Sequence, residues 1–270
     1  MFYNAPKFKG FMVLKYPVYV ISLQKDEWRR DRLRENFKSY DEFEMIDAFD
    51  AKNLSATKYY EILLDSLLKS INMPAVETIL LSPTEVACAI SHTCAYERFL
   101  DSGAKFGLIF EDDIVGNDDD IKRAFELCEK ISEDSIFVCG AQDGLSSRFR
   151  AFGKRLNNDL FLISPYSYAS IYRGAAYIVT RQSAKALLDF HKSGLYVVDR
   201  WATLLNNVNL KMYFSNIFTH PVDIQNSNLQ AQRDRKNLVD TLFIRKKSSL
   251  KDKISRFYDK HLSGNQMIFK

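Results

Sequence analysis

The stretch Gly107-Leu-Ile-Phe-Glu-Asp-Asp113 joins a short apolar run directly to three consecutive carboxylates. An apolar run of this kind predicts a buried strand that ends at Glu111. In α/β proteins, the carboxyl edge of a parallel sheet is where ligands bind. Three adjacent carboxylates repel one another, and Mg²⁺ and Mn²⁺ prefer oxygen ligands, so we expect a divalent cation here. A solvated acidic turn is the alternative that composition alone leaves open.

A helix is predicted just before this strand. Ser82-Pro-Thr-Glu85 is typical of a helix start, with a capping serine, a proline at the first position and a glutamate that completes a capping box. The helix should run to about Asp101, with Gly103 just past its end.

The rest of the chain predicts an α/β protein. In the N-terminal part, strands at 17–23 and 43–46 alternate with helices at 25–40 and 56–70, which favours a largely parallel sheet. In the second half turns replace several helices; one helix is expected at 181–192, and strands at 135–139, 160–163, 175–179 and 212–218. We therefore expect a mixed, mostly parallel sheet flanked by helices.

Composition narrows the class of protein. Hydrophobic residues make up 46% of the 270 residues and charged residues 27%, which is enough apolar material for a packed core. The net charge of +4 is too small for a dedicated nucleic-acid binder. Four cysteines without a C-x-x-C pair predict reduced thiols in a cytoplasmic protein rather than a disulfide scaffold. They are Cys88, Cys94, Cys128 and Cys139.

No segment predicts passage through a membrane. The apolar stretch 11–23 contains Lys15 and Pro17 and lacks a small-residue cleavage site, so we do not expect a signal peptide. From about Phe243 the chain turns basic, and we divide it into a main domain, 1–242, and a basic amphipathic extension, 243–270. The extension could rest on an anionic membrane surface, or it could be a solvated helix.

Several motifs in order resemble glycosyltransferase family 25, the bacterial lipooligosaccharide galactosyltransferases and their collagen-modifying relatives. The motifs are Val20-Ile-Ser-Leu23 followed by Arg29-Arg30, the strand 43–47, Leu81 to His92, Leu108 to Ile114, and Gly174 to Thr180. Together they span roughly residues 16–228. Two departures stand out: Ala87 precedes Cys88 where the family usually has glycine, and Ala175-Ala176 replaces a more glycine-rich segment. These departures bear on the donor sugar more than on the reaction class.

The resemblance implies a GT-A fold, a UDP-sugar donor (UDP-galactose above all), Mn²⁺ or Mg²⁺, and transfer with inversion to a β linkage. The implied acceptor is a lipooligosaccharide, lipopolysaccharide or other surface glycan, reached from the cytoplasm at the inner face of the membrane. The metal would be held by Asp113, with Asp112 or Glu111 assisting and His220 added from the end of the core. An ordinary turn histidine is the alternative for His220.

The resemblance also places donor and catalytic residues. Those expected at the donor site are Ser22, Leu23, Arg29, Arg30, Asp47, His92, Glu111, Asp112 and Asn226, with Ser227 beside the last. Arg29 or Arg30 would reach a phosphate. Asp199 would be the base that deprotonates the acceptor hydroxyl, or else a helix cap. Trp201 could stack on an acceptor sugar, although a core tryptophan is the more usual case.

Two other functions fit the same residues. One is another metal-dependent phosphate enzyme, such as a nucleotidyltransferase, although neither G-x-x-x-x-G-K-[ST] nor G-x-G-x-x-G occurs in the sequence. The other is a catalytically silent glycan-binding protein of the same fold.

Overall fold

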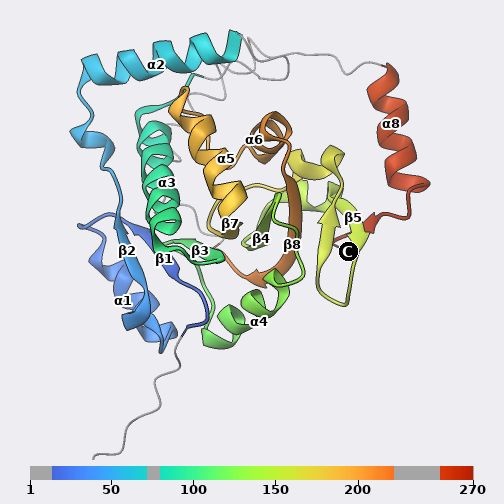
Figure 1. The fold of residues 1–270 in the computed structure, drawn as a ribbon, viewed down its shortest axis with the longest axis horizontal. Helices are drawn as coiled ribbons and strands as arrows, with labels where there is room; N and C mark the ends of the chain where they lie inside the picture. Colours follow the sequence, from blue (N-terminus) through green and yellow to red (C-terminus); the bar gives the residue numbers. More distant parts are fainter. Residues whose placement is uncertain (1–13, 72–79, 222–249, 270) are drawn as a thin grey trace, which may run out of the picture.

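A computed structural model describes residues 14–71, 80–221 and 250–269. Its centre is a nine-stranded sheet with the order β2-β1-β3-β7-β4-β8-β6-β5-β9 (Figure 1). The strands are β1 Val18–Ser22, β2 Glu44–Asp47, β3 Phe106–Glu111, β4 Ser135–Gly140, β5 Phe152–Arg155, β6 Phe161–Ile163, β7 Ala176–Thr180, β8 Lys211–Phe218 and β9 Gln266–Met267. The helices are α1 Glu27–Asn36, α2 Ala56–Ile71, α3 Pro83–Ser102, α4 Asp118–Cys128, α5 Arg181–Lys192, α6 Trp201–Val208 and α8 Leu250–His261.

The sheet is mixed, as predicted, but it is not mostly parallel. β1 is parallel to both β2 and β3, and β4 is parallel to β8. β7 lies between β3 and β4 and runs antiparallel to both, while β6 is antiparallel to β8 and β5 is antiparallel to β6 and β9. The prediction of a parallel majority is wrong because β7 enters the sheet in reverse between two strands that come before it in the chain.

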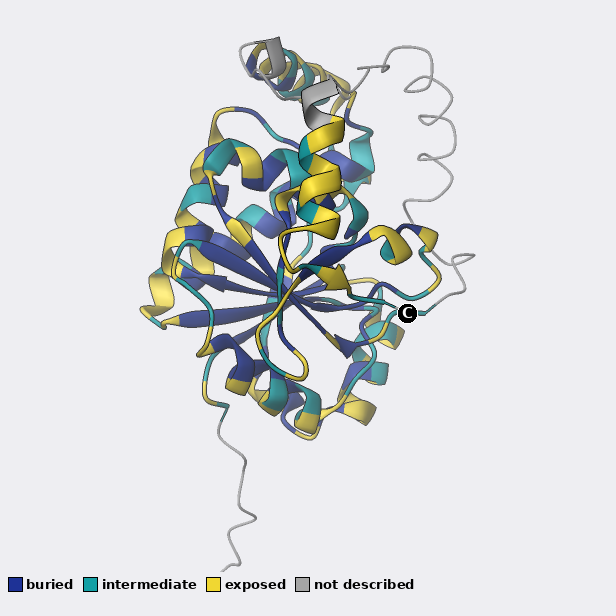
Figure 2. Ribbon diagram, turned by 90° about the vertical axis from the view of Figure 1, so that its right-hand side faces the viewer, coloured by how far each residue is buried: buried dark blue, intermediate teal, exposed yellow. Residues whose placement is uncertain are grey.

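Helices cover both faces of this sheet, and the strands between them are buried (Figure 2). Along β1, Tyr19 and Ile21 pack into the core that includes residues of α3, α5 and α6, whereas Val18 and Val20 pack into the core beneath α1 and α4. Successive residues of a strand point to opposite faces, so a strand covered on both sides is apolar throughout. This explains the unbroken apolar runs in the sequence.

The predicted start and end of α3 are confirmed. The Ser82 hydroxyl accepts a hydrogen bond from the Glu85 amide, and the Glu85 carboxylate accepts one from the Ser82 amide. Gly103 ends the helix with φ +73°, a left-handed conformation that favours glycine. This helix packs closely on β3: Gly107 of the strand lies so near Phe99 of the helix that an added Cβ would come within 2.5 Å of the Phe99 ring.

The C-terminal residues return to the sheet. β9 pairs with β5 at the edge, and the Phe269 ring lies 5.2 Å from that of Phe214. Helix α8 stands next to this edge in Figure 1. The predicted boundary between residues 242 and 243 lies outside the described residues. Among the described helices, none has the length and apolar character needed to cross a membrane.

Candidate active site

A cleft of about 530 Å³ opens at the carboxyl ends of β1, β2 and β3, beside the first turns of α3. One part of its wall is apolar, including Ile21, Leu23 and Phe49, and another part carries the three carboxylates predicted from the sequence. These carboxylates are Glu111, Asp112 and Asp113. The cleft therefore lies where the α/β arrangement predicts a ligand site.

The three carboxylates do not form one cluster, because the chain alternates at the end of β3. Ile109 packs toward α3, and Phe110 packs toward α1 and α4. Glu111 continues the first direction and lies against α3, whereas Asp112 continues the second and meets α1. The three consecutive carboxylates therefore contact two separate sets of partners, one on α1 and one on α3.

The first set joins Asp112 to Arg29 of α1. Arg29 Nη1 lies 2.8 Å from Asp112 Oδ1 and 3.4 Å from Asp113 Oδ2. The Arg29 and Asp112 side chains are only 12% and 9% exposed. Burial raises the pKa of Asp112 above its usual range, and the neighbouring guanidinium opposes that shift. Arg29 thus neutralises the acidic pair from within the cleft wall.

His220 lies next to Asp113, as the resemblance implied. Its Nε2 is 3.3 Å from Asp113 Oδ2. A pair of backbone hydrogen bonds between Val115 and Thr219 brings the two segments together. Burial lowers the pKa of His220, but the Asp113 carboxylate outweighs burial and the net direction is upward. The pKa of Asp113 is lowered overall, because His220 and nearby arginines outweigh its burial.

These residues fit a divalent cation. Asp113 Oδ1 is buried and, within the described part of the chain, has no hydrogen-bond partner. A buried carboxylate oxygen without a partner is costly unless a cation or ordered water meets it. Carboxylate oxygens are the donors that Mg²⁺ and Mn²⁺ prefer, and imidazole is a common additional ligand of transition metals.

Of the remaining residues expected at the donor site, some line the cleft and others stabilise the segments that form it. Leu23 lines the cleft, while Arg30 donates to the Leu23 and Gln24 carbonyl oxygens and to the Ser22 hydroxyl. Arg30 therefore fixes the end of β1. Asp47 is exposed and accepts a hydrogen bond from Gln24; it is not among the residues that line the cleft.

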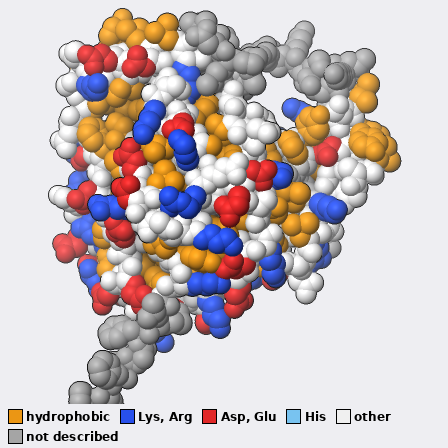
Figure 3. Space-filling model, in the orientation of Figure 1, with side chains coloured by type: hydrophobic (Ala, Val, Ile, Leu, Met, Phe, Trp, Pro, Cys, Tyr) orange, Lys and Arg blue, Asp and Glu red, His pale blue; other side chains and the backbone are white. Residues whose placement is uncertain are grey.

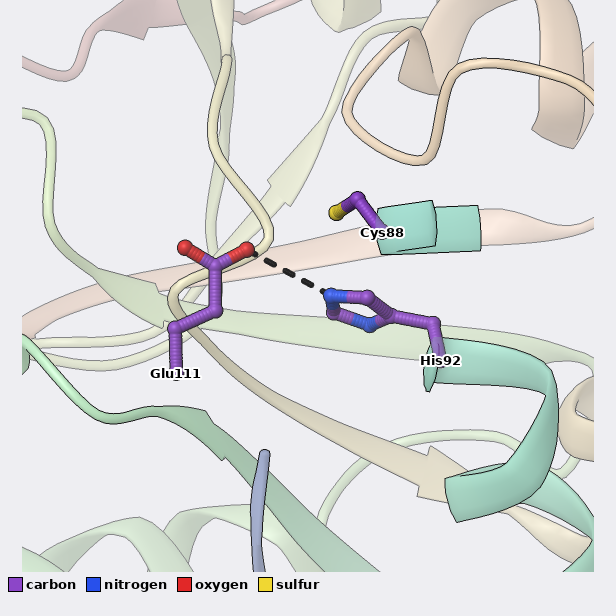
Figure 4. Close-up of side chains that lie close together, drawn as sticks. All are labelled: Cys88, His92 and Glu111. Carbon is purple, nitrogen blue, oxygen red and sulfur yellow. Dashed lines mark hydrogen bonds and ion pairs between the residues drawn. The ribbon is translucent and has the colours of Figure 1, made fainter. Parts of the chain in front are cut away.

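His92 belongs to the second set of partners, together with Glu111 and Cys88 (Figure 4). Its side chain is fully buried, with Nδ1 2.7 Å from the Tyr177 hydroxyl and Nε2 3.4 Å from Glu111 Oε1. Gly174 packs beside this cluster, where a Cβ would make an ordinary contact of 3.4 Å with His92 Cε1. His92 is not among the residues that line the cleft and meets it only through Glu111, as a helix-packing histidine would; its role at the donor site stays a prediction.

The expected base, Asp199, and the residue expected to stack on the acceptor sugar, Trp201, lie at or just before the start of α6. Asp199 is half-buried ahead of α6, and the N-cap position belongs to Arg200, which makes no side-chain cap. Trp201 is fully buried and donates its indole N–H to the Arg173 carbonyl at 3.2 Å, so it is a core residue. Asn226 and Ser227 lie outside the described residues.

The sequence analysis missed a set of residues that support His220. Asp143 accepts a hydrogen bond from the His220 amide at 3.0 Å, and Arg173 donates to the Asp143 carbonyl at 2.8 Å. Gln142 is buried and bonds the Tyr172 backbone through both ends of its amide. No motif marks these residues.

Comparisons with known proteins identify the family of this chain. The profile of the family described as Glycosyltransferase family 25 (LPS biosynthesis protein) matches residues 15–201. A protein of Haemophilus influenzae, described as a predicted glycosyltransferase, is 30% identical over 202 residues. That match covers 72% of this chain and 66% of the relative, so the chain spans slightly less than two thirds of the relative's length.

Two solved structures are similar at low scores. A mannose-1-phosphate geranyltransferase from Thermus thermophilus has 12% identity and a TM-score of 0.32, over 75% of this chain and 74% of its own. The galactosyltransferase LgtC, solved with donor and acceptor sugar analogues, has 8% identity and a TM-score of 0.31, over 86% and 98%. Scores this low carry no conclusion. The family profile covers more than half of the chain, and this chain belongs to glycosyltransferase family 25.

Proposed function

We propose that the protein is a metal-dependent, inverting glycosyltransferase of GT-A type that moves a hexose from a UDP-sugar to a surface glycan. UDP-galactose is the proposed donor, and a β linkage to a lipooligosaccharide or lipopolysaccharide is the proposed product. The observation that carries the proposal is the pairing of Asp113 with His220 beside a buried carboxylate oxygen that has no partner among the described residues. Membership of the family supports the reaction class.

In this proposal Asp113, Asp112 and His220 hold the cation at the side of the cleft that Asp112 and Asp113 line. A divalent ion there would neutralise the charge that develops on the departing diphosphate. Arg29 already touches both aspartates, so it can turn toward a phosphate oxygen when the carboxylates bind the cation. The apolar wall formed by Ile21, Leu23 and Phe49 suits the flat face of a nucleobase.

Inversion by a single displacement requires a base next to the acceptor hydroxyl. We propose Asp199 for this role. The preceding residue, Val198, lies against Gly174, since a Cβ built on Gly174 would be 3.5 Å from Val198 Cγ1 and 3.7 Å from Glu111 Oε1. Asp199 therefore follows a residue that packs against Gly174, and Gly174 lies beside Glu111, a residue of the cleft wall.

Helix α8 supports a membrane-associated acceptor. Ile254 and Phe257 of α8 are each 61% exposed, and Leu262, just past its end, is 64% exposed. Figure 3 shows hydrophobic side chains on the outer surface where α8 stands in Figure 1. Exposed Lys253, Arg256 and Lys260 share the helix. On its other side, Asp259 accepts a hydrogen bond from Ser164 and so links α8 to the body. An apolar strip with flanking cations is typical of a helix that lies on anionic lipid.

Vesicle flotation tests this contact. The protein should float with anionic vesicles and not with neutral ones, and the double variant Ile254→Ser, Phe257→Ser should lose flotation. Leu156→Ser removes an exposed leucine elsewhere and should leave flotation unchanged. Equal flotation of the double variant and the wild type would remove the membrane contact.

Turnover tests the reaction. With Mn²⁺, a UDP-hexose and a lipooligosaccharide acceptor, we expect UDP release that requires the acceptor. Asp113→Asn should abolish it, whereas Asp119→Asn, an exposed aspartate in the first turn of α4, should not. Asp199→Asn should still bind the donor and fail to transfer. UDP binding without transfer to any acceptor would favour the silent glycan-binding alternative, and turnover without an acceptor would favour another phosphate enzyme.

A further inference from the structure

The function proposed above does not explain why Cys88, His92 and Glu111 lie close together. A sulfur, a ring nitrogen and a carboxylate oxygen of these residues all lie within 4.8 Å of one another. Cys88 and His92 stand one turn apart on α3, and Glu111 ends β3 (Figure 4). Residues four apart on a helix share a face, so α3 presents both donors to the same point.

The hydrogen bonds of Tyr177 decide which ring nitrogen of His92 carries its proton. Tyr177 donates its hydroxyl hydrogen to Tyr96 at 2.9 Å. Its oxygen must then accept from His92 Nδ1, 2.7 Å away. A neutral His92 consequently has its lone pair on Nε2, and Nε2 points at Glu111. A lone pair and a carboxylate that face each other need a positive charge between them, which either a proton or a metal ion supplies.

The spacing between His92 and Glu111 suits a metal ion better than a hydrogen bond, and the Cys88 sulfur, within 4.8 Å of both atoms, would move closer to complete the site. His92 Nε2 and Glu111 Oε1 are 3.4 Å apart, longer than an ordinary N–H···O bond. In tetrahedral zinc, bonds of about 2.0–2.3 Å place neighbouring ligand atoms about 3.3–3.6 Å apart. Cysteine sulfur, imidazole nitrogen and carboxylate oxygen are all zinc ligands, and three protein ligands leave a fourth position open.

We propose that Cys88, His92 and Glu111 form a zinc-binding site in the wall of the donor cleft. Cys88 and Glu111 both line that cleft, so the fourth position can take an oxygen from water or from a bound molecule. Binding releases the thiol proton of Cys88 to solvent, because the thiolate is the ligand. Tyr177 acts as a positioning residue that orients His92. The site is separate from the one at Asp113 and does not depend on the proposed function.

Cobalt titration of the full-length, reduced protein tests this site, because Co²⁺ substitutes for Zn²⁺ and a thiolate ligand produces a charge-transfer absorption band. The wild type should develop this band with one equivalent of Co²⁺ and lose it when Zn²⁺ is added. Cys94→Ser, an exposed cysteine of the same helix, and Asp113→Asn should behave like the wild type. Cys88→Ser should lack the band.

Two further variants keep the test decisive if Cys88→Ser does not fold. Glu111→Gln should weaken Zn²⁺ binding at least tenfold, and Tyr177→Phe should weaken it roughly 10- to 100-fold, as loss of a supporting partner does at other metal sites. An unchanged band in Cys88→Ser, no band in the wild type, or unchanged Zn²⁺ affinity in Glu111→Gln would overturn the proposal. Loss of Zn²⁺ binding in Asp113→Asn would also overturn it, because the metal would then belong to the other site.

Discussion

Replacing Arg29 with Met should destabilise the protein unless a divalent cation is present. The guanidinium lies 2.8 Å from Asp112 and 3.4 Å from Asp113, and its side chain is 12% exposed. Removing one partner of a buried ion pair costs about 3–5 kcal/mol, since the other charge stays buried and uncompensated. A domain of this size loses about 2–4 °C of Tm per kcal/mol, which gives a decrease of about 6–20 °C.

Mn²⁺ should restore much of this loss, because the two carboxylates attract a cation more strongly once Arg29 is gone. At a concentration 100-fold above Kd, a ligand of the folded state adds about 2.7 kcal/mol. Thermal unfolding with and without Mn²⁺ measures both effects. Arg98→Met is the matched control, because Arg98 pairs with Glu44 at the surface and should contribute less than about 1 kcal/mol. A Mn²⁺-induced increase in Tm no larger in Arg29→Met than in the wild type would refute the reasoning.

Three further predictions concern stability. Ser82→Ala removes the cap of α3 and should cost about 1 kcal/mol in chemical denaturation, with Ser102→Ala at the far end of the helix for comparison; an unchanged midpoint would contradict the cap. Burial lowers the pKa of Lys69 to about 7, so the unfolded chain binds more protons between pH 7 and about 10.5. The free energy of unfolding should therefore rise with pH across that window in the wild type, and it should rise less in Lys69→Met. Equal slopes in the two proteins would contradict this, and would show that Lys69 keeps its proton because the Phe190 and Gly194 carbonyl oxygens accept hydrogen bonds from it. Trp201→Phe should lower stability by about 1–3 kcal/mol in the same assay and leave UDP affinity by calorimetry unchanged, because Trp201 is a core residue; a selective loss of acceptor affinity would restore the sugar-stacking interpretation.

Local signals in the sequence predicted local structure well. The capping box involves only Ser82 and Glu85, and the helix end depends on Gly103 alone. Each feature is local, so the sequence specifies it directly. Strand direction depends on contacts between distant segments. The insertion of β7 between β3 and β4 leaves no mark in the sequence of β7, and the predicted parallel majority therefore failed.

The sequence predicted which residues belong to the candidate site better than it predicted how they are arranged. The acidic stretch was placed at a cleft, but its division between Arg29 and His92 follows from strand alternation past the end of β3, where the sequence gives no sign that the strand geometry continues. The support of His220 by Asp143 depends on a turn with no motif. The sequence does contain one signal next to this turn, the glycine at position 140. In the structure it has φ +113°, and a Cβ there would lie 2.3 Å from the Phe218 carbonyl oxygen, so only glycine fits.

The proposed function depends on a divalent cation that Asp113 and His220 would hold for the diphosphate of a nucleotide sugar. Calorimetric titration of UDP into the wild type and Asp113→Asn, each with and without Mn²⁺, measures this directly. We predict UDP binding to the wild type that requires Mn²⁺ and is lost in the variant. UDP binding of equal strength in both proteins without any metal would contradict the account.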